Sequence, residues 1–218
     1  MMLAAPAASH REREGLYRDV AAYYGSRLGA HGPTPLGVDW TCEPTQQLRF
    51  VQLLKACDFT QPFSLNDLGC GYGALRGFLG VRWPKAQVDY LGIDLVPEMI
   101  AAASRKWDGI EGAAFAVGSN CPRVADYSVA SGVFNVKLDQ PAEAWEAFIR
   151  AMLDDLAANS RLGFAVNFLR AVDTEPRVPQ LYRALPQTWI DYCEKELGAR
   201  VEVLSSYGMR EFTLLARK

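Results

Sequence analysis

The sequence is poor in the residues that build disulfide frameworks, zinc sites and histidine-centred catalytic groups. Its five cysteines are scattered, and no two of them form a Cys-x-x-Cys pair. This spacing argues against a disulfide framework or a zinc site. Such cysteine usage is typical of a reducing compartment and predicts a cytoplasmic protein. The two histidines are His10 and His31.

The sequence also lacks a strong excess of positive or negative charge and has no long apolar run. The formal net charge is −2 and no block of lysine or arginine stands out. Because a nucleic-acid partner requires a basic face to offset phosphate charge, nucleic acid is disfavoured. No apolar run is long enough to span a bilayer, so no membrane partner is expected. Residues 1–9 are alanine-rich without a charged leader, and we interpret them as a loose tail, not a signal peptide.

The most informative stretch is residues 64–75, Ser-Leu-Asn-Asp-Leu-Gly-Cys-Gly-Tyr-Gly-Ala-Leu. An apolar run ends in an acid, three glycines follow at alternate positions, and a helical pattern begins. This predicts a buried strand that turns sharply into a helix. Glycine permits positive φ and leaves no side chain between the backbone amides and a ligand. An ordinary turn is the alternative, and the spacing is neither Gly-x-Gly-x-x-Gly nor the Walker lysine loop. We interpret the stretch as a ligand-binding loop.

A second acid supports this interpretation. Residues 88–94, Val-Asp-Tyr-Leu-Gly-Ile-Asp, predict the next buried strand, which ends in Asp94. In a doubly wound sheet, an acid at this strand tip can accept hydrogen bonds from both ribose hydroxyls of a nucleoside. Asp94 could instead cap the helix that opens at Pro97. Capping explains the two acids and the glycine loop together less well.

This set of residues resembles the class I S-adenosylmethionine-dependent methyltransferases. The resemblance covers roughly residues 60–218 and is strongest from Asp67 to Met99. It implies an α/β fold, a Rossmann-like seven-stranded mostly parallel sheet in the order 3-2-1-4-5-7-6 with helices on both faces. Strand seven is expected to be antiparallel between strands five and six. We expect a flexible tail over residues 1–14, a helical cover over 15–60 and the cofactor-binding core over 61–218.

The resemblance implies S-adenosylmethionine as the cofactor and assigns roles residue by residue. Leu95 and Met99 match the adenine pocket, although a core methionine is the alternative for Met99. Ser119 and Asn120 stand where the family often has an acid that reaches the adenine amino group, and this sequence lacks that acid. The turn after the fourth strand is expected beside the methionine half. The predicted cofactor-binding residues are Asp67, Gly69, Cys70, Gly71, Gly73, Asp94, Leu95, Met99, Ser119, Asn120, Ser131 and Gly132.

The same turn bears on the methyl acceptor. Methyltransferases that act on nucleic-acid bases carry Asn/Asp-Pro-Pro-aromatic at this point, whereas residues 131–134 read Ser-Gly-Val-Phe. This removes most of the case for base methylation. Asn135 and Asp139 lack the companion carboxylates of a catechol-methyltransferase metal site, so we assign no metal.

Two further segments are predicted to contact the substrate. In the family, the N-terminal extension closes the cofactor cleft, and aromatic rings in it suit a sulfonium cation; packing of a helix onto the core explains the two tyrosines equally well. The irregular stretch 169–185 lies where the family places a substrate lid, and its arginines favour an anionic acceptor, unless the loop is simply solvated. The predicted substrate-binding residues are Tyr23, Tyr24, Trp40, Phe134, Asn135, Arg170, Arg177, Tyr182 and Arg183.

We therefore expect a methyltransferase that acts on a small molecule, at a carboxylate or hydroxyl oxygen. A carboxylate needs no base, whereas a hydroxyl needs one poised near neutral pH, for which His31 is the candidate. The motif Gly-Val-Asp-Trp at residues 37–40, followed by Gln46, Gln47 and Arg49, resembles small bacterial methyltransferases of the trans-aconitate type, although likeness at this level says little about the acceptor. A cofactor-binding or regulatory protein without transfer activity is the alternative; the intact glycines and both acids favour catalysis.

Overall fold

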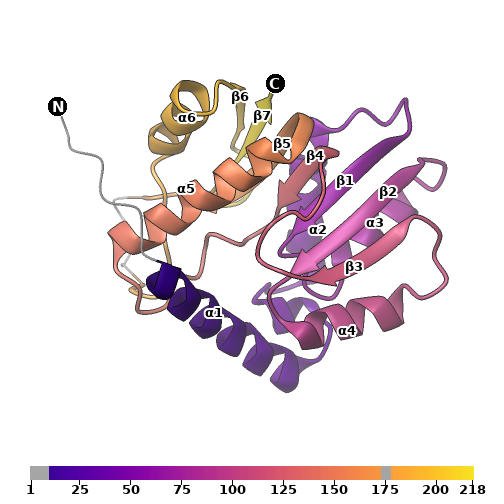
Figure 1. Ribbon diagram of the computed structural model, residues 1–218, viewed down its shortest axis with the longest axis horizontal. Helices are drawn as coiled ribbons and strands as arrows, with labels where there is room; N and C mark the ends of the chain where they lie inside the picture. The colour runs from indigo at the N-terminus through magenta and orange to yellow at the C-terminus, as the bar shows by residue number, and fades with distance from the viewer. Residues whose placement is uncertain (1–9, 173–177) are drawn as a thin grey trace.

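The computed structural model describes residues 10–172 and 178–218, which form one seven-stranded sheet with helices around it (Figure 1). The segment before the sheet is helical: α1 (His10–His31), η1 (Pro35–Val38), α2 (Glu43–Leu53) and η2 (Leu54–Ala56). The strands are β1 (Phe63–Leu68), β2 (Val88–Asp94), β3 (Ala113–Val117), β4 (Ala125–Ala130), β5 (Ser160–Leu169), β6 (Arg200–Leu204) and β7 (Glu211–Arg217). The remaining helices are α3 (Ala74–Arg82), α4 (Pro97–Lys106), α5 (Ala142–Ala158) and α6 (Pro186–Lys195).

The strand order is β3-β2-β1-β4-β5-β7-β6, which confirms the predicted topology. The strands from β3 to β5 are parallel, and β7 lies antiparallel between β5 and β6. The carboxyl ends of β1, β2, β4 and β5 consequently meet at one edge of the sheet. In Figure 1 the indigo helix α1 lies beyond the edge at which the arrow of β2 ends. In open α/β sheets this is the edge at which ligands bind.

Two hydrophobic layers cover the sheet, because successive strand residues face opposite sides. Phe164 and Phe168 of β5 pack in the layer that contains Trp145 of α5 and residues of α6. Ala165, between them, belongs to the opposite layer, together with Phe50 of α2 and residues of α3. Residues of β7 alternate in the same way between the two layers. The alternation explains why β5 and β7 read as continuous apolar runs.

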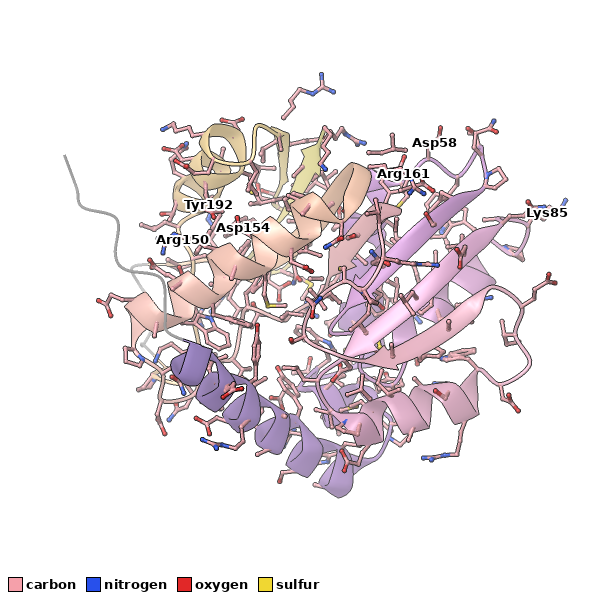
Figure 2. The ribbon with its side chains drawn as sticks, viewed as in Figure 1. Asp58, Lys85, Arg150, Asp154, Arg161 and Tyr192 are labelled. Atoms are coloured by element: carbon pink, nitrogen blue, oxygen red, sulfur yellow. The ribbon has the colours of Figure 1, made fainter. Side chains whose placement is uncertain are left out.

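Helix α6 is fixed to α5 by polar contacts at the surface as well as by the core (Figure 2). The hydroxyl of Tyr192 donates to Asp154 Oδ1 over 2.7 Å. The guanidinium of Arg150 lies 5.7 Å from the ring centre of Trp189. These contacts lie between α5 and α6, on the half of the sheet that β5, β7 and β6 form.

Helix α1, in the segment predicted as a cover, packs at the carboxyl edge of the sheet. Leu16 is buried in the larger core layer, and the ring of Tyr17 meets Phe148 of α5 at 5.8 Å between centroids. Further along, α1 contacts η1 and α4. The helix begins at His10, so residues 10–14 of the segment predicted as a tail are helical. None of the helices within the described ranges is long and apolar enough to cross a bilayer.

The described residues between β5 and α6, 170–172 and 178–185, form no helix and no strand of the sheet. Arg170 pairs with Ala184 and Val136 with Leu181 through isolated β-bridges. The backbone N–H of Tyr182 donates to the carbonyl of Asn135 over 2.8 Å. These contacts fasten the described parts of the stretch beside the turn after β4.

Candidate cofactor and acceptor site

The glycine loop after β1 has the backbone conformation that its sequence predicts. Gly69, Gly71 and Gly73 have φ of 77°, 55° and 75°, which side chains rarely adopt. A Cβ at Gly69 would stand 2.4 Å from Val133 Cγ2, and one at Gly73 2.6 Å from Trp107 Nε1. At Gly71 the nearest atom is Val38 Cγ1 of the cover, at 3.0 Å. Backbone conformation therefore favours glycine at all three positions, and lack of space favours it further at Gly69 and Gly73.

Asp94 ties the tip of β2 to this loop. Its Oδ2 accepts a hydrogen bond of 2.8 Å from the backbone N–H of Gly71, and its Oδ1 accepts one of 2.9 Å from Val96, where α4 begins. Asp94 thus serves the helix start and the glycine loop at once. Burial raises the pKa of its carboxyl. Each oxygen keeps a lone pair, so the carboxylate can still accept the two hydroxyls of a ribose.

Asp67, at the end of β1, is a second buried acid close by. It is 2% exposed and accepts a hydrogen bond of 2.5 Å from the hydroxyl of Tyr90. Burial raises the pKa of Asp67 to about 7. Its charge near neutral pH is therefore sensitive to any cation that binds beside it.

A cavity at the carboxyl edge brings most of the predicted cofactor residues together. The glycine loop and the tip of β2 form one wall, the turn after β4 forms another, and the cover closes it. Ser131 contributes a buried Oγ that has no hydrogen-bond partner among the described residues. The predicted residues that line the cavity are Asp67, Gly69, Cys70, Gly71, Asp94, Leu95, Met99, Ser119, Ser131, Gly132, Tyr24 and Trp40.

The cover supplies two aromatic walls at different places. Tyr24 lies over the cofactor side: burial raises the pKa of its hydroxyl, and the nearby carboxylates of Asp39 and Asp94 raise it further. Trp40 lies on the turn after β4, where a Cβ at Gly132 would stand 2.2 Å from its Cζ2. In this cavity Tyr24 therefore lies near Asp94, and Trp40 lies against the turn after β4.

Tyr23 does not line the cavity and instead holds the cover together. Its hydroxyl donates to Asp39 Oδ2, and burial raises the pKa of Tyr23 to about 12. Arg27 Nε pairs with Asp39 Oδ1 over 2.6 Å, and Arg27 Nη2 donates to the carbonyl of Leu36 over 3.1 Å. We call Tyr23, Arg27 and Asp39 the latch, because they fasten α1 to the segment that carries Val38 and Trp40.

The other predicted residues lie outside the cavity lining. Phe134 and Tyr182 are buried in the larger core layer, and the Tyr182 hydroxyl donates to Glu146. Asn135 is buried and accepts from the backbone N–H of Leu169 over 3.2 Å. The further predicted residues outside the lining are Gly73, Asn120, His31, Arg170 and Arg183, and Arg177 lies outside the described residues. Their predicted roles, and the anionic character of the acceptor that the arginines suggest, stay predictions.

Sequence reasoning did not identify several lining residues of the cover and α2. Gln46 lines the cavity and accepts a hydrogen bond of 3.0 Å from the hydroxyl of Tyr72. Phe50, one helical turn later, lines it too. The signal was present, since polar Gln46 and Arg49 stand on the same helix face as apolar Phe50 and Leu53. Polar residues on a buried helix face mark a site or a buried network.

The described residues contain no candidate metal-binding group. Within residues 10–172 and 178–218, no group of three His, Cys, Asp or Glu side chains is placed to hold a metal ion. All five cysteines are free thiols. Oxygen-rich metal sites need several converging ligands. The site therefore has to be understood through its loop amides, acids and aromatic walls.

Comparison with known proteins identifies the family and the fold. No protein-family model matches the chain. A Mycobacterium tuberculosis H37Rv protein named "Putative methyltransferase Rv1506c" is 44% identical over 169 residues, which are 77% of this chain and 99% of that one. Trans-aconitate 2-methyltransferase of Mycobacterium tuberculosis H37Ra is 39% identical over 57 residues, 26% of this chain and 21% of the enzyme. That local match covers too little of the enzyme to suggest its substrate.

Solved structures share the fold at low sequence identity. A Leishmania major S-adenosylmethionine-dependent methyltransferase superimposes with a TM-score of 0.63 and 15% identity, covering 94% of this chain and 84% of its own. Magnesium protoporphyrin IX methyltransferase of Synechocystis, solved with bound S-adenosylhomocysteine, gives 0.54 and 15% over 95% and 84% of the two chains. With this fold, this site and the near-full-length relative, the chain belongs to the class I S-adenosylmethionine-dependent methyltransferases.

Proposed function

We propose that this protein transfers the methyl group of S-adenosylmethionine to an oxygen of a small molecule, a carboxylate or a hydroxyl. The observation that carries the proposal is that the glycine loop, Asp94 and the Ser131–Gly132 turn meet in one cavity under Tyr24 and Trp40. Asp94 would hold the ribose hydroxyls, the loop amides and Asp67 the methionine half, and Leu95 and Met99 the adenine. The cofactor supplies a methyl group on a positively charged sulfur.

The residues present fit such a cofactor. The buried Asp67 and the half-buried Asp94 line the cavity, and no arginine, lysine or histidine stands among its described lining residues. A negatively charged wall favours a ligand that carries a sulfonium and an ammonium. The unpartnered Ser131 Oγ offers one further hydrogen bond to a ligand in the same cavity.

A small acceptor is supported by the cover. Trp40 and Gly132 are in contact, so an acceptor must fit beneath α1 and the η1 segment. The contribution of these residues is to align the acceptor and to exclude water, since the methyl group is already activated. A carboxylate acceptor needs no base, which suits a lining without histidine; a hydroxyl acceptor needs one, and His31 stays the candidate. We also propose a cytoplasmic location, supported by the five free thiols.

Two measurements test the proposal. Calorimetric titration should show that the protein binds S-adenosylhomocysteine, the product that remains after transfer. Labelled S-adenosylmethionine, incubated with a panel of small carboxylic acids and sugars, should yield a methylated compound. Binding without turnover on any acceptor would favour the alternative, a regulatory protein that senses the cofactor. No binding at all would contradict both functions.

A further inference from the structure

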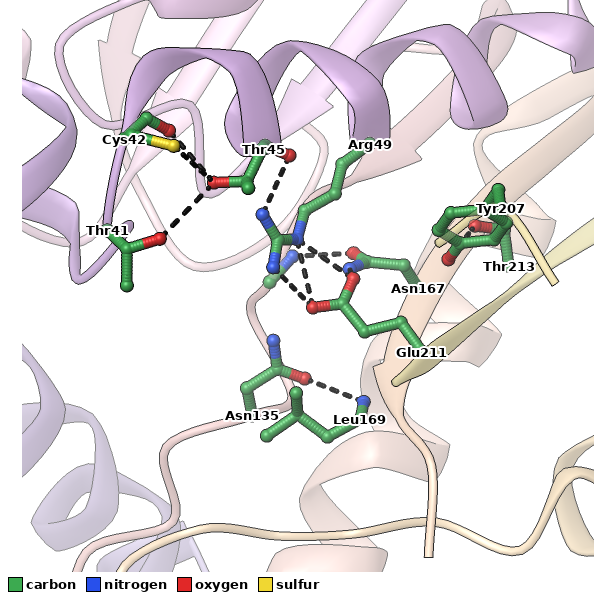
Figure 3. Close-up of polar contacts among 11 residues, drawn as sticks. Thr41, Cys42, Thr45, Arg49, Asn135, Asn167, Leu169, Tyr207, Glu211 and Thr213 are labelled. Carbon is green, nitrogen blue, oxygen red and sulfur yellow. Dashed lines mark hydrogen bonds and ion pairs between the residues drawn. The ribbon is translucent and has the colours of Figure 1, made fainter. Parts of the chain in front are cut away.

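A buried ion pair lies beside the cavity and takes no part in the proposed chemistry. Arg49 of α2 and Glu211 at the start of β7 are 5% and 2% exposed and stand 162 positions apart in the chain. Arg49 Nε donates to Glu211 Oε1 and Oε2 over 3.0 and 2.8 Å, and Nη2 donates to Oε1 (Figure 3). Arg49 Nη1 donates to the carbonyl of Thr45 over 2.8 Å. Each guanidinium nitrogen donates at least one hydrogen bond within the protein.

Hydrogen bonds continue from this pair to the turn after β4. Asn167 of β5 is fully buried, and its Nδ2 donates to Glu211 Oε2 over 3.0 Å. Its Oδ1 accepts a hydrogen bond of 2.7 Å from the backbone N–H of Gly132. The ion pair is thereby linked to the backbone that forms one wall of the cavity.

Trp40 closes the chain of contacts into a ring. The guanidinium carbon of Arg49 lies 3.7 Å from the ring centre of Trp40, at stacking distance. The same indole rests against Gly132, where φ is 75° and a Cβ would meet Trp40 Cζ2 at 2.2 Å. We call Trp40, Arg49, Glu211, Asn167 and Gly132 the Arg49 network.

We propose that Arg49 and Glu211 are positioning residues that hold Trp40 against Gly132 and so set the acceptor side of the cavity. This inference rests on the proposed function, because Trp40 and Gly132 are its acceptor-side wall. Stability alone does not account for the pair, since apolar residues of the same volume often stabilise a core as well or better. A fully satisfied polar network instead specifies one arrangement of the groups it joins. The edge of the planar Arg49 guanidinium hydrogen-bonds the carboxylate of Glu211 while its face stacks on the indole of Trp40. A lysine ammonium cannot make both contacts in this way.

The position of Trp40 can be observed directly in 5-fluorotryptophan-labelled protein by 19F NMR. The protein has five tryptophans, and the Trp40 resonance is identified by its loss in Trp40→Phe. Arg49→Lys keeps the charge pair but removes the stack, so we expect the Trp40 resonance to move while the other four stay. The dissociation constant for S-adenosylhomocysteine should rise by up to about thirtyfold, which corresponds to the loss of one desolvated cation–π contact. Glu211→Gln, nearly isosteric, should move the same resonance if Arg49→Lys does not fold.

Controls separate positioning from general destabilisation. Leu156→Ala removes a fully buried side chain that is not in the cavity wall. It should lower Tm and leave the Trp40 resonance in place. Gly132→Ala should move that resonance, because the new methyl group displaces the indole. An unmoved Trp40 resonance in folded Arg49→Lys or Glu211→Gln, or an equal movement in Leu156→Ala, would overturn the inference. If the wild-type protein does not bind S-adenosylhomocysteine, the proposed function fails, whereas the resonances still decide whether Arg49 positions Trp40.

Discussion

The two sides of the cavity are built from contacts of very different range. On the cofactor side, Asp94 reaches Gly71 across 23 positions, and Tyr90 reaches Asp67 across the same number. On the acceptor side, Arg49 reaches Glu211 across 162 positions, and Asn167 reaches Glu211 across 44. The contacts on the cofactor side lie within one β1-α3-β2 unit. Those on the proposed acceptor side require α2 of the N-terminal cover to meet β7, the last strand. The contacts between Asp94, Asp67 and the glycine loop can therefore be encoded in one short stretch, whereas those around Trp40, on the proposed acceptor side, cannot.

The largest expected effect is on the acceptor side. Glu211→Ala leaves the Arg49 guanidinium buried without its carboxylate and Asn167 Nδ2 without its acceptor. Breaking a buried pair from one side typically costs 3–5 kcal/mol, so we expect about that loss in the free energy of unfolding by denaturant titration. Asp191→Asn breaks the exposed pair with Lys195 and should change it by less than about 1 kcal/mol. Equal losses in the two variants would mean that the buried pair contributes no more to the free energy of unfolding than an exposed one.

The next effect should fall on the cofactor side. Asp94→Ala removes the carboxylate that is proposed to hold the ribose and frees the backbone N–H groups of Gly71 and Val96. Two charge-assisted hydrogen bonds are at stake, so binding of S-adenosylhomocysteine should weaken by roughly 2–4 kcal/mol in calorimetry. A folded variant with wild-type affinity would remove Asp94 from the site.

The pH dependence of binding should report Asp67. Its folded-state pKa of about 7 lies above its ordinary value, so it destabilises the fold when charged. The unliganded protein should lose stability as pH rises from about 4 through 7, because the folded state binds the extra proton over that window. A cation beside Asp67 favours the charged form, so affinity for S-adenosylhomocysteine should rise about tenfold from pH 6 to pH 8. In Asp67→Asn this rise should vanish; a rise that persists would assign it to another group.

The smallest effect should come from the latch. Tyr23→Phe removes the hydrogen bond to Asp39, which is worth about 1 kcal/mol, and leaves the cavity wall unchanged. Thermal unfolding should detect that loss, and S-adenosylhomocysteine should bind slightly more weakly. Tyr192→Phe removes a comparable hydroxyl bond to Asp154 between α5 and α6. That control should lower Tm without changing affinity; the reverse pattern would contradict the latch.

The sequence predicted those parts whose physical signals are local. Strand β2 was predicted with the observed bounds, and the acid at its tip does contact the glycine loop. The surroundings of the proposed substrate residues could not be read from the sequence: Phe134 and Tyr182 lie in the core, and Tyr23 faces Asp39. An aromatic residue in a turn looks the same in sequence whether it faces a ligand or a neighbouring helix. The ion pair of Arg49 with Glu211 could not be inferred, because the two residues are 162 positions apart and no local sequence pattern connects them.

The latch also bears on how fast a ligand enters. Tyr24, Val38 and Trp40 belong to segments that Tyr23, Arg27 and Asp39 join, so the cover should open as one body and not side chain by side chain. If opening precedes entry, the observed association rate with S-adenosylhomocysteine should level off at high concentration, at the opening rate. Tyr23→Phe should raise that plateau. Stopped-flow fluorescence, with the tryptophans as reporters, would measure this plateau and show whether opening of the cover limits the rate of ligand entry.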